Sequence, residues 1–275
     1  MKLSTLLLPF VVLTSLTLTV GCQSGEGTDV TETNTTSVDD VDDTPTDDVD
    51  DTGDSNEDPV PPTKVLFIGN SFTYWNSGLE THVEALRAGT GDNIFETQEE
   101  TEGGASLEVM WSQSNARNRI EQGGFDVVVL QEDIPETSVE SFHTYARLFD
   151  EAIRASGAKP VFFMAWDYER LNWISMDEIA DAHWTIAEEL DIAVAPVGLA
   201  WKRAAEERPS LDMYGNDREH PSIHGTYLAA TTIYSVLFQE SPVGLTYTPT
   251  QQGGVSKDEA AFLQGVAWDE LQASP

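Results

Sequence analysis

The sequence predicts an α/β protein, a three-layer α/β/α sandwich around a five-stranded, mainly parallel sheet. Two observations predict this class. Short apolar runs alternate along the chain with longer segments of helical periodicity, and the apolar runs are rich in β-branched and aromatic residues. Strands that alternate with helices pair in parallel, and their helices cover both faces of the sheet.

Five segments are expected to form the strands. Residues 64–68 (KVLFI) make a β-branched and aromatic run that stops at a Gly-Asn-Ser turn, and residues 125–130 (FDVVVL) carry the clearest strand signal. Residues 159–164 (KPVFFM) and 192–195 (IAVA) are short apolar runs between helical segments. Residues 93–98 are less apolar, so we expect them at an edge of the sheet.

Helical periodicity accounts for the segments between the strands. Leu79, Val83 and Leu86 recur at helical spacing within residues 79–87, and an apolar stripe runs along residues 139–155. The other expected helices are residues 107–120, 176–190, 201–208, 222–238 and 257–271.

The amino-terminal 63 residues differ from the rest of the chain. Residues 1–21 have an early lysine, an apolar core and a small residue before Cys22, as in a lipoprotein signal peptide whose cleavage leaves Cys22 as the lipidated first residue. An ordinary secretory signal is the alternative. We therefore expect a bacterial cell-envelope protein that is anchored to a membrane by lipid, with the outer membrane or cell surface favoured.

Residues 22–63 are expected to form a disordered Asp- and Thr-rich tether. They contain 14 acidic residues and no aromatic residue, so they cannot bury enough apolar surface to fold. The remaining domain, residues 64–275, holds 34 acidic and 13 basic residues, a charge near −21. Nucleic acid is an improbable partner for such a chain, because phosphate binding needs clustered Lys and Arg.

Three residues form a candidate catalytic set. Ser71 follows the first strand, at the sheet edge where α/β proteins place ligands. Asp217 and His220 stand together about 150 residues later, and they complete a Ser-His-Asp nucleophile system. The alternative for Ser71 alone is a role as the N-cap of the following helix.

These blocks resemble the SGNH hydrolases, also called GDSL-like esterases and lipases. Residues 69–73 (GNSFT) match the first family block, with Asn where many members have Asp, and residues 217–222 (DREHPS) match the last. The resemblance covers the whole of residues 64–275. It implies the flavodoxin-like SGNH fold, ester hydrolysis through an acyl-serine intermediate, and no cofactor.

The same resemblance implies an oxyanion hole. Its expected donors are the backbone N–H of Ser71 and that of Gly104 or Gly103, with Gly104 slightly favoured. Gln131 stands where the family usually has Asn, and its carboxamide is expected to supply the third donor. The alternative is that Gln131 bonds to nearby backbone at the end of its strand.

Aromatic residues and histidines near the expected strand ends complete the candidates. Trp75, Trp166 and Tyr168 are expected to line a sugar or acyl pocket, with packing beneath loops as the alternative. His224 follows His220 by four residues, but Pro221 intervenes and the Glu of a zinc motif is missing, so no metal site is expected.

The expected function is that of a serine esterase acting on small-molecule or polysaccharide esters, with carbohydrate O-acetyl esters leading and lipid esters second. The alternative from another class is a non-catalytic SGNH-like module that binds glycan.

Overall fold

The computed structural model describes residues 60–171 and 173–275. Its sheet contains five parallel strands in the order β2-β1-β3-β4-β5. The expected fold class is confirmed. The strands are β1 (Lys64–Gly69), β2 (Glu96–Thr101), β3 (Val127–Gln131), β4 (Lys159–Phe163) and β5 (Ala193–Ala195).

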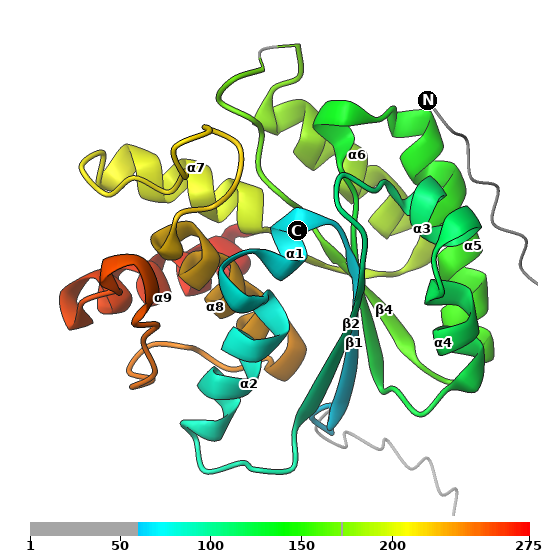
Figure 1. Ribbon diagram of the computed structural model, residues 1–275, viewed down its shortest axis with the longest axis horizontal. Coiled ribbons are helices and arrows are strands. Elements are labelled where there is room, and N and C mark those ends of the chain that lie inside the picture. Colours follow the sequence, from blue (N-terminus) through cyan, green and yellow to red (C-terminus); the bar gives the residue numbers. More distant parts are fainter. Residues whose placement is uncertain (1–59, 172) are drawn as a thin grey trace, which may run out of the picture. The chain divides into compact units, whose positions relative to one another are not determined.

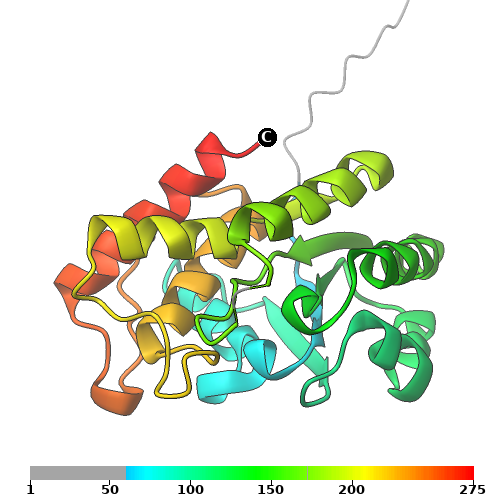
Figure 2. The ribbon, with the colours of Figure 1, turned by 90° about the horizontal axis from the view of Figure 1, so that it is seen from above.

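Helices follow each strand and form a layer on either side of the sheet (Figures 1 and 2). The α-helices are α1 (Ser71–Tyr74), α2 (Leu79–Ala88), α3 (Leu107–Gln113), α4 (Ala116–Gln122), α5 (Val139–Ala155), α6 (Met176–Leu190), α7 (Val197–Glu207), α8 (Ile223–Phe238) and α9 (Lys257–Ala273). Three short 3₁₀ turns are η1 (Trp75–Ser77), η2 (Ile134–Glu136) and η3 (Gln251–Gly253).

The alternation of side chains along β1 divides the core in two. Val65 and Phe67 pack with buried residues of α2, α7, α8 and α9. Leu66 and Ile68 point to the other face and pack with α3, α4, α5 and α6. Both faces of β1 are apolar because helices cover both, as expected for a central parallel strand.

The strand order reverses between β1 and β3, since the chain leaves β1 toward β2 and returns to β3 on the other side. In open α/β sheets this switch point opens a crevice at the carboxyl ends of the strands. Here those ends are Gly69 of β1 and Gln131 of β3. Figure 1 shows α1 at the end of β1.

Three elements differ from the expectation. The edge strand β2 runs over Glu96–Thr101 instead of 93–98. The segment expected as one helix, 107–120, is two helices, because the backbone of Ser114 is extended and its hydroxyl accepts a hydrogen bond from the N–H of Ala116. Helix α7 begins at Val197 instead of Trp201. Gly198 permits this early start, since a Cβ there would lie 2.4 Å from the carbonyl oxygen of Ala165.

The expected signal peptide, residues 1–21, lies outside the described residues, as do Cys22 and most of the expected tether, 22–63. Within the described ranges, no helix combines the length and apolar character needed to span a membrane.

Candidate active site

Ser71 is placed by a turn that only glycine can begin. A Cβ on Gly69 would lie 2.5 Å from the hydroxyl of Thr73 and 2.7 Å from Oε1 of Gln131, so this position has no room for a side chain. Asn70 then caps α1, because its side-chain oxygen accepts a hydrogen bond from the N–H of Phe72 at 3.0 Å. Ser71 is therefore the first residue of α1 and is not its cap.

The side chains of Ser71, His220 and Asp217 form a continuous hydrogen-bonded chain. Oγ of Ser71 lies 2.8 Å from Nε2 of His220, and Nδ1 of His220 lies 2.8 Å from Oδ2 of Asp217. Ser71 and His220 are 149 positions apart in the sequence, so the fold itself brings them together. This is the geometry of a serine activated by a histidine that a carboxylate orients.

A short hairpin holds the histidine and the aspartate. The N–H of Gly215 donates to the carbonyl of His220 at 2.7 Å, and Tyr214 and Pro221 form an isolated antiparallel bridge. Arg218 lies at the tip with φ of 60°, a left-handed conformation that side chains other than glycine seldom adopt. This hairpin brings the side chains of Asp217 and His220 within hydrogen-bond distance of each other.

Hydrogen bonds to Asp217 keep it ionised. Burial raises the pKa of this carboxyl, but the side chain of His220 and the backbone N–H groups of His220 and Glu219 outweigh burial and lower the pKa below its usual value. The carboxylate is thus available to hold Nδ1 of His220 as the proton donor. That tautomer leaves Nε2 free to accept the proton of Ser71.

Two aromatic side chains fix the imidazole plane. The ring of Trp75 stacks on His220 with centroids 4.0 Å apart, and Phe72 meets it edge-on at 5.8 Å. Trp166 lies below Phe72, and its indole N–H donates to the carbonyl of Glu219 at 2.9 Å. These contacts anchor the catalytic hairpin to the residues that follow Ser71.

The expected oxyanion donors have unused N–H groups. Among the described residues, none accepts a hydrogen bond from the backbone N–H of Ser71, Gly103 or Gly104. The glycine loop is joined to the turn, because the N–H of Glu102 donates to the carbonyl of Gly69 at 3.2 Å. Gly104 has φ of 66°, a conformation that glycine adopts without strain.

Gln131 lies under the turn and is fully buried. Its Oε1 accepts the N–H of Asn70 at 2.8 Å, and its Nε2 donates to the carbonyl of Glu132 at 2.9 Å. The carboxamide therefore supports the backbone before Ser71. A role as third oxyanion donor would require its Nε2 to leave the Glu132 carbonyl.

Comparison with known proteins identifies the fold. No family model and no curated protein matches the chain. A putative SGNH hydrolase from Slackia heliotrinireducens is 24% identical, with a TM-score of 0.55 over 64% of this chain and 98% of that one. The fold is that of the SGNH hydrolases.

Other solved structures agree on the fold. A DUF4886 family protein from Bacteroides uniformis is 17% identical, with a TM-score of 0.58 over 76% of this chain and 94% of that one. An acetyl xylan esterase is 16% identical, with a TM-score of 0.52 over 62% of this chain and 98% of that one. The chain thus shares its fold with hydrolases and esterases at low sequence identity.

Two buried carboxyl groups at the end of β3 had no role in the sequence-based interpretation. Asp133 accepts hydrogen bonds from Nδ2 of Asn70 at 2.9 Å and from the hydroxyl of Tyr168 at 2.5 Å. Glu132 accepts the N–H of Leu107 at 3.2 Å, at the start of the helix that follows the glycine loop. Each carboxyl group thus supports a segment that carries an expected oxyanion donor.

Burial shifts the pKa of both groups. It raises the pKa of Asp133 to about 6 and that of Glu132 to about 7, and hydrogen bonds offset the shift only in part. The sequence signal for them was their position directly after Gln131, where a buried strand ends at the same edge as Ser71.

The three aromatic residues expected to line a pocket divide into two groups. Trp75 is partly exposed and covers His220. Trp166 and Tyr168 are buried to within 2% of their surface, so they lie beneath the site and do not form its wall. Trp166 stacks between Phe72 and Trp201, which is the packing alternative for this residue.

The other histidines lie away from Ser71. His82 contacts the hydroxyl of Tyr247, His143 contacts the carbonyl of Ala182, and His183 contacts that of Ile179. His224 lies 3.5 Å from Glu259. Within residues 60–171 and 173–275, no group of three or more His, Cys, Asp or Glu side chains is arranged to hold a metal ion.

Proposed function

We propose that this protein is a serine esterase that hydrolyses carboxylic esters through an acyl-serine intermediate. The observation that carries the proposal is the chain of two 2.8 Å contacts that joins Ser71 to His220 and His220 to Asp217. A serine hydroxyl in such a chain passes its proton to the histidine as it attacks an ester carbonyl at neutral pH.

Each step uses a group already described. Nε2 of His220 takes the proton of Ser71 as Oγ attacks the carbonyl carbon, and the negative charge develops on the former carbonyl oxygen. The N–H groups of Ser71 and Gly104 stabilise that charge, and each such donor is typically worth about 3 kcal/mol in the transition state. His220 then protonates the leaving alcohol, and water attacks the acyl-serine by the reverse sequence.

The natural substrate that we propose is an O-acetyl ester of a carbohydrate. The structural similarity to an acetyl xylan esterase supports the same substrate class. The signal-like sequence of residues 1–21 predicts that this enzyme is anchored in the cell envelope through Cys22. That anchoring stays a prediction from the sequence.

Purified protein lacking residues 1–59 should test the activity. We expect hydrolysis of p-nitrophenyl acetate, slower hydrolysis of the octanoate, release of acetate from acetylated xylan, and labelling of Ser71 by a fluorophosphonate. Ser71→Ala should lower kcat by about 10⁴-fold or more. Ser241→Ala, which alters an exposed serine after α8, should retain full activity and serves as the control.

The absence of ester hydrolysis and of labelling would overturn the proposal. Retained glycan binding by both wild type and Ser71→Ala, with no turnover by either, would establish the non-catalytic binding module instead. Loss of activity with a chelator and none with the fluorophosphonate would indicate metal-dependent hydrolysis.

A further inference from the structure

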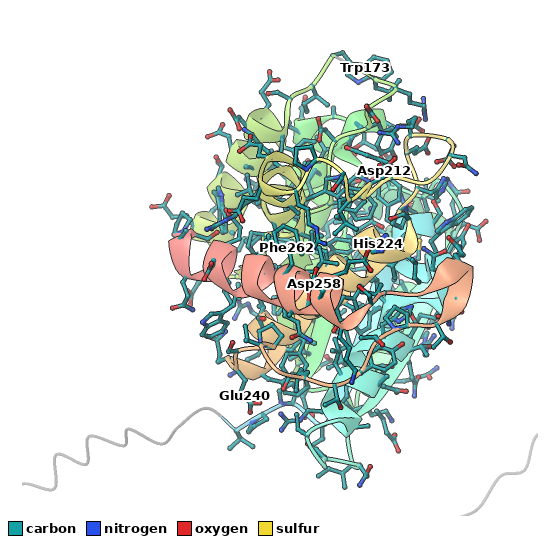
Figure 3. The ribbon with its side chains drawn as sticks, turned by 90° about the vertical axis from the view of Figure 1, so that its left-hand side faces the viewer. Trp173, Asp212, His224, Glu240, Asp258 and Phe262 are labelled. Carbon is teal, nitrogen blue, oxygen red and sulfur yellow. The ribbon has the colours of Figure 1, made fainter. Side chains whose placement is uncertain are left out.

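A second concave region lies beyond the catalytic hairpin. A pocket of about 520 Å³ is formed by the start of α8, the loop before α9 and the first turn of α9. Figure 3 turns this side of the molecule toward the viewer, with His224 on α8 above Asp258 at the start of α9. Pockets of this size accommodate small ligands.

His224 lines the pocket and lies against Glu259, which also lines it. Its Nε2 is buried and has no hydrogen-bond partner within the described residues, and the nearest carboxylate oxygen, Oε2 of Glu259, is 3.5 Å away. Glu259 is already engaged, because that oxygen accepts the N–H of Ser256 at 2.8 Å.

The chemistry of the lining favours a neutral ligand with many hydroxyl groups. Hydroxyl and amide side chains predominate, and Glu259 is the only formally charged side chain that lines the pocket apart from His224. The polar lining residues are His224, Thr248, Thr250, Gln252, Ser256 and Glu259. Alternating donors and acceptors without a basic cluster suit a sugar ring, whereas an anion would meet the carboxylate.

The pocket is joined to the catalytic residues by one asparagine. The side-chain amide of Asn76 donates to the carbonyl of Pro221 at 3.1 Å and to Thr226 at 2.8 Å. Its Oδ1 accepts a hydrogen bond from Gln252 in the pocket wall. Asn76 follows Trp75, which stacks on His220, so the pocket begins on the far side of the residues that flank the catalytic imidazole.

We propose that this pocket is a sugar-binding subsite, which holds a glycosyl unit of the carbohydrate while another unit of the same oligosaccharide presents its acetyl ester to Ser71. The proposal rests on the proposed function, since it assigns the alcohol part of that substrate. It makes the enzyme selective for esters on an oligosaccharide over esters on a single sugar.

The test compares acetylated xylotetraose, acetylated methyl xyloside and p-nitrophenyl acetate. We expect kcat/KM for the tetraose to exceed that for the xyloside. Thr250 is exposed and lines the pocket, so Thr250→Trp should place an indole in it. We expect kcat/KM for the tetraose, divided by kcat/KM for p-nitrophenyl acetate, to fall about tenfold in this variant. His224→Leu, which removes the ring nitrogens, should lower the same ratio.

Thr246→Trp is the matched control, because Thr246 is exposed in the same loop region but does not line the pocket. It should leave the ratio unchanged. Equal kcat/KM for tetraose and xyloside, with no change of the ratio in Thr250→Trp, would overturn the subsite while p-nitrophenyl acetate hydrolysis preserves the esterase. Failure to hydrolyse any of the three esters would overturn the proposed function itself.

Discussion

The nucleophile and its proton acceptor are held by two regions of very different character. Ser71 follows a buried turn that ends at Asn70, the cap of α1. The backbone N–H of Asn70 donates a hydrogen bond to the buried side chain of Gln131, and its side-chain amide donates one to that of Asp133. His220 lies on an exposed hairpin, which charged surface side chains connect to neighbouring loops. Arg218 pairs there with Glu169 and Asp212.

A second arginine bridges the hairpin to another loop. Arg170 pairs with Glu219, next to His220, and with Glu136 at 2.8 Å. Ion pairs at such exposed positions contribute little individually and weaken in salt, whereas buried hydrogen bonds are insensitive to salt. The nucleophile is thus held by buried hydrogen bonds, whereas the hairpin that carries the acid–base pair is held by exposed ion pairs in addition to its aromatic contacts.

The largest effect should come from the buried side. Asp133→Asn replaces an acceptor with an amide that cannot accept from both Asn70 and Tyr168 at the same time. We expect the cap of α1 to shift and kcat for p-nitrophenyl acetate to fall about 100-fold, as for a misplacement near 1 Å. KM should change less than threefold, because Asp133 is buried and does not contact substrate.

Tyr168→Phe provides the matched control for Asp133. It removes only the donor that contacts Oδ1 and leaves the bond from Asn70 to Oδ2 intact. Its loss of kcat should be under tenfold. Full activity of Asp133→Asn in a correctly folded protein, judged by circular dichroism, would show that the turn needs no support from this carboxyl group.

The pH dependence of stability should report on the carboxyl groups of the buried region. Burial raises the pKa of Glu132 to about 7, so the folded protein favours the neutral carboxyl. That contribution is complete below the unfolded-state pKa, near 4.5, and is lost as pH rises through about 7. We expect the free energy of unfolding in urea to fall by about 2 kcal/mol from pH 5 to pH 8.

Glu132→Gln should remove much of this fall. Glu80, whose pKa burial also raises to about 7, should add a fall of similar size, so Glu80→Gln serves as the comparison. Unfolding free energies that are equal at pH 5 and pH 8 in the wild type would contradict the assignment of neutral buried carboxyls.

Sequence reasoning predicted the parts of the site that local patterns encode. The apolar run 64–68 and the Gly-Asn-Ser turn specify a strand end, and the Asp-x-x-His spacing lets one short hairpin present both side chains. The sheet and five of its helical segments followed from periodicity in the same way. The edge position of β2 followed from its low apolar content.

Long-range contacts between polar groups could not be predicted in this way. Asn70 and Asp133 are 63 positions apart, and no local pattern shows that their side chains meet. The burial of Trp166 depends on α7, whose Trp201 covers the other face of its ring at 4.0 Å. The role of Gln131 likewise depends on a close approach to Gly69 that only the packed sheet creates.

The smallest predicted effect concerns the exposed hairpin. Arg218→Gln keeps a polar side chain but removes its ion pairs with Glu169 and Asp212. We expect kcat/KM for p-nitrophenyl acetate to fall about threefold at low salt, in line with about 0.6 kcal/mol for an exposed pair. In 1 M NaCl the wild type should fall toward the variant, since salt screens the same pairs. Arg147→Gln, which breaks an equally exposed pair with Glu189 between α5 and α6, should change neither the rate nor its response to salt. A 100-fold loss in Arg218→Gln would instead show that the hairpin is as rigidly fixed as the turn at Ser71.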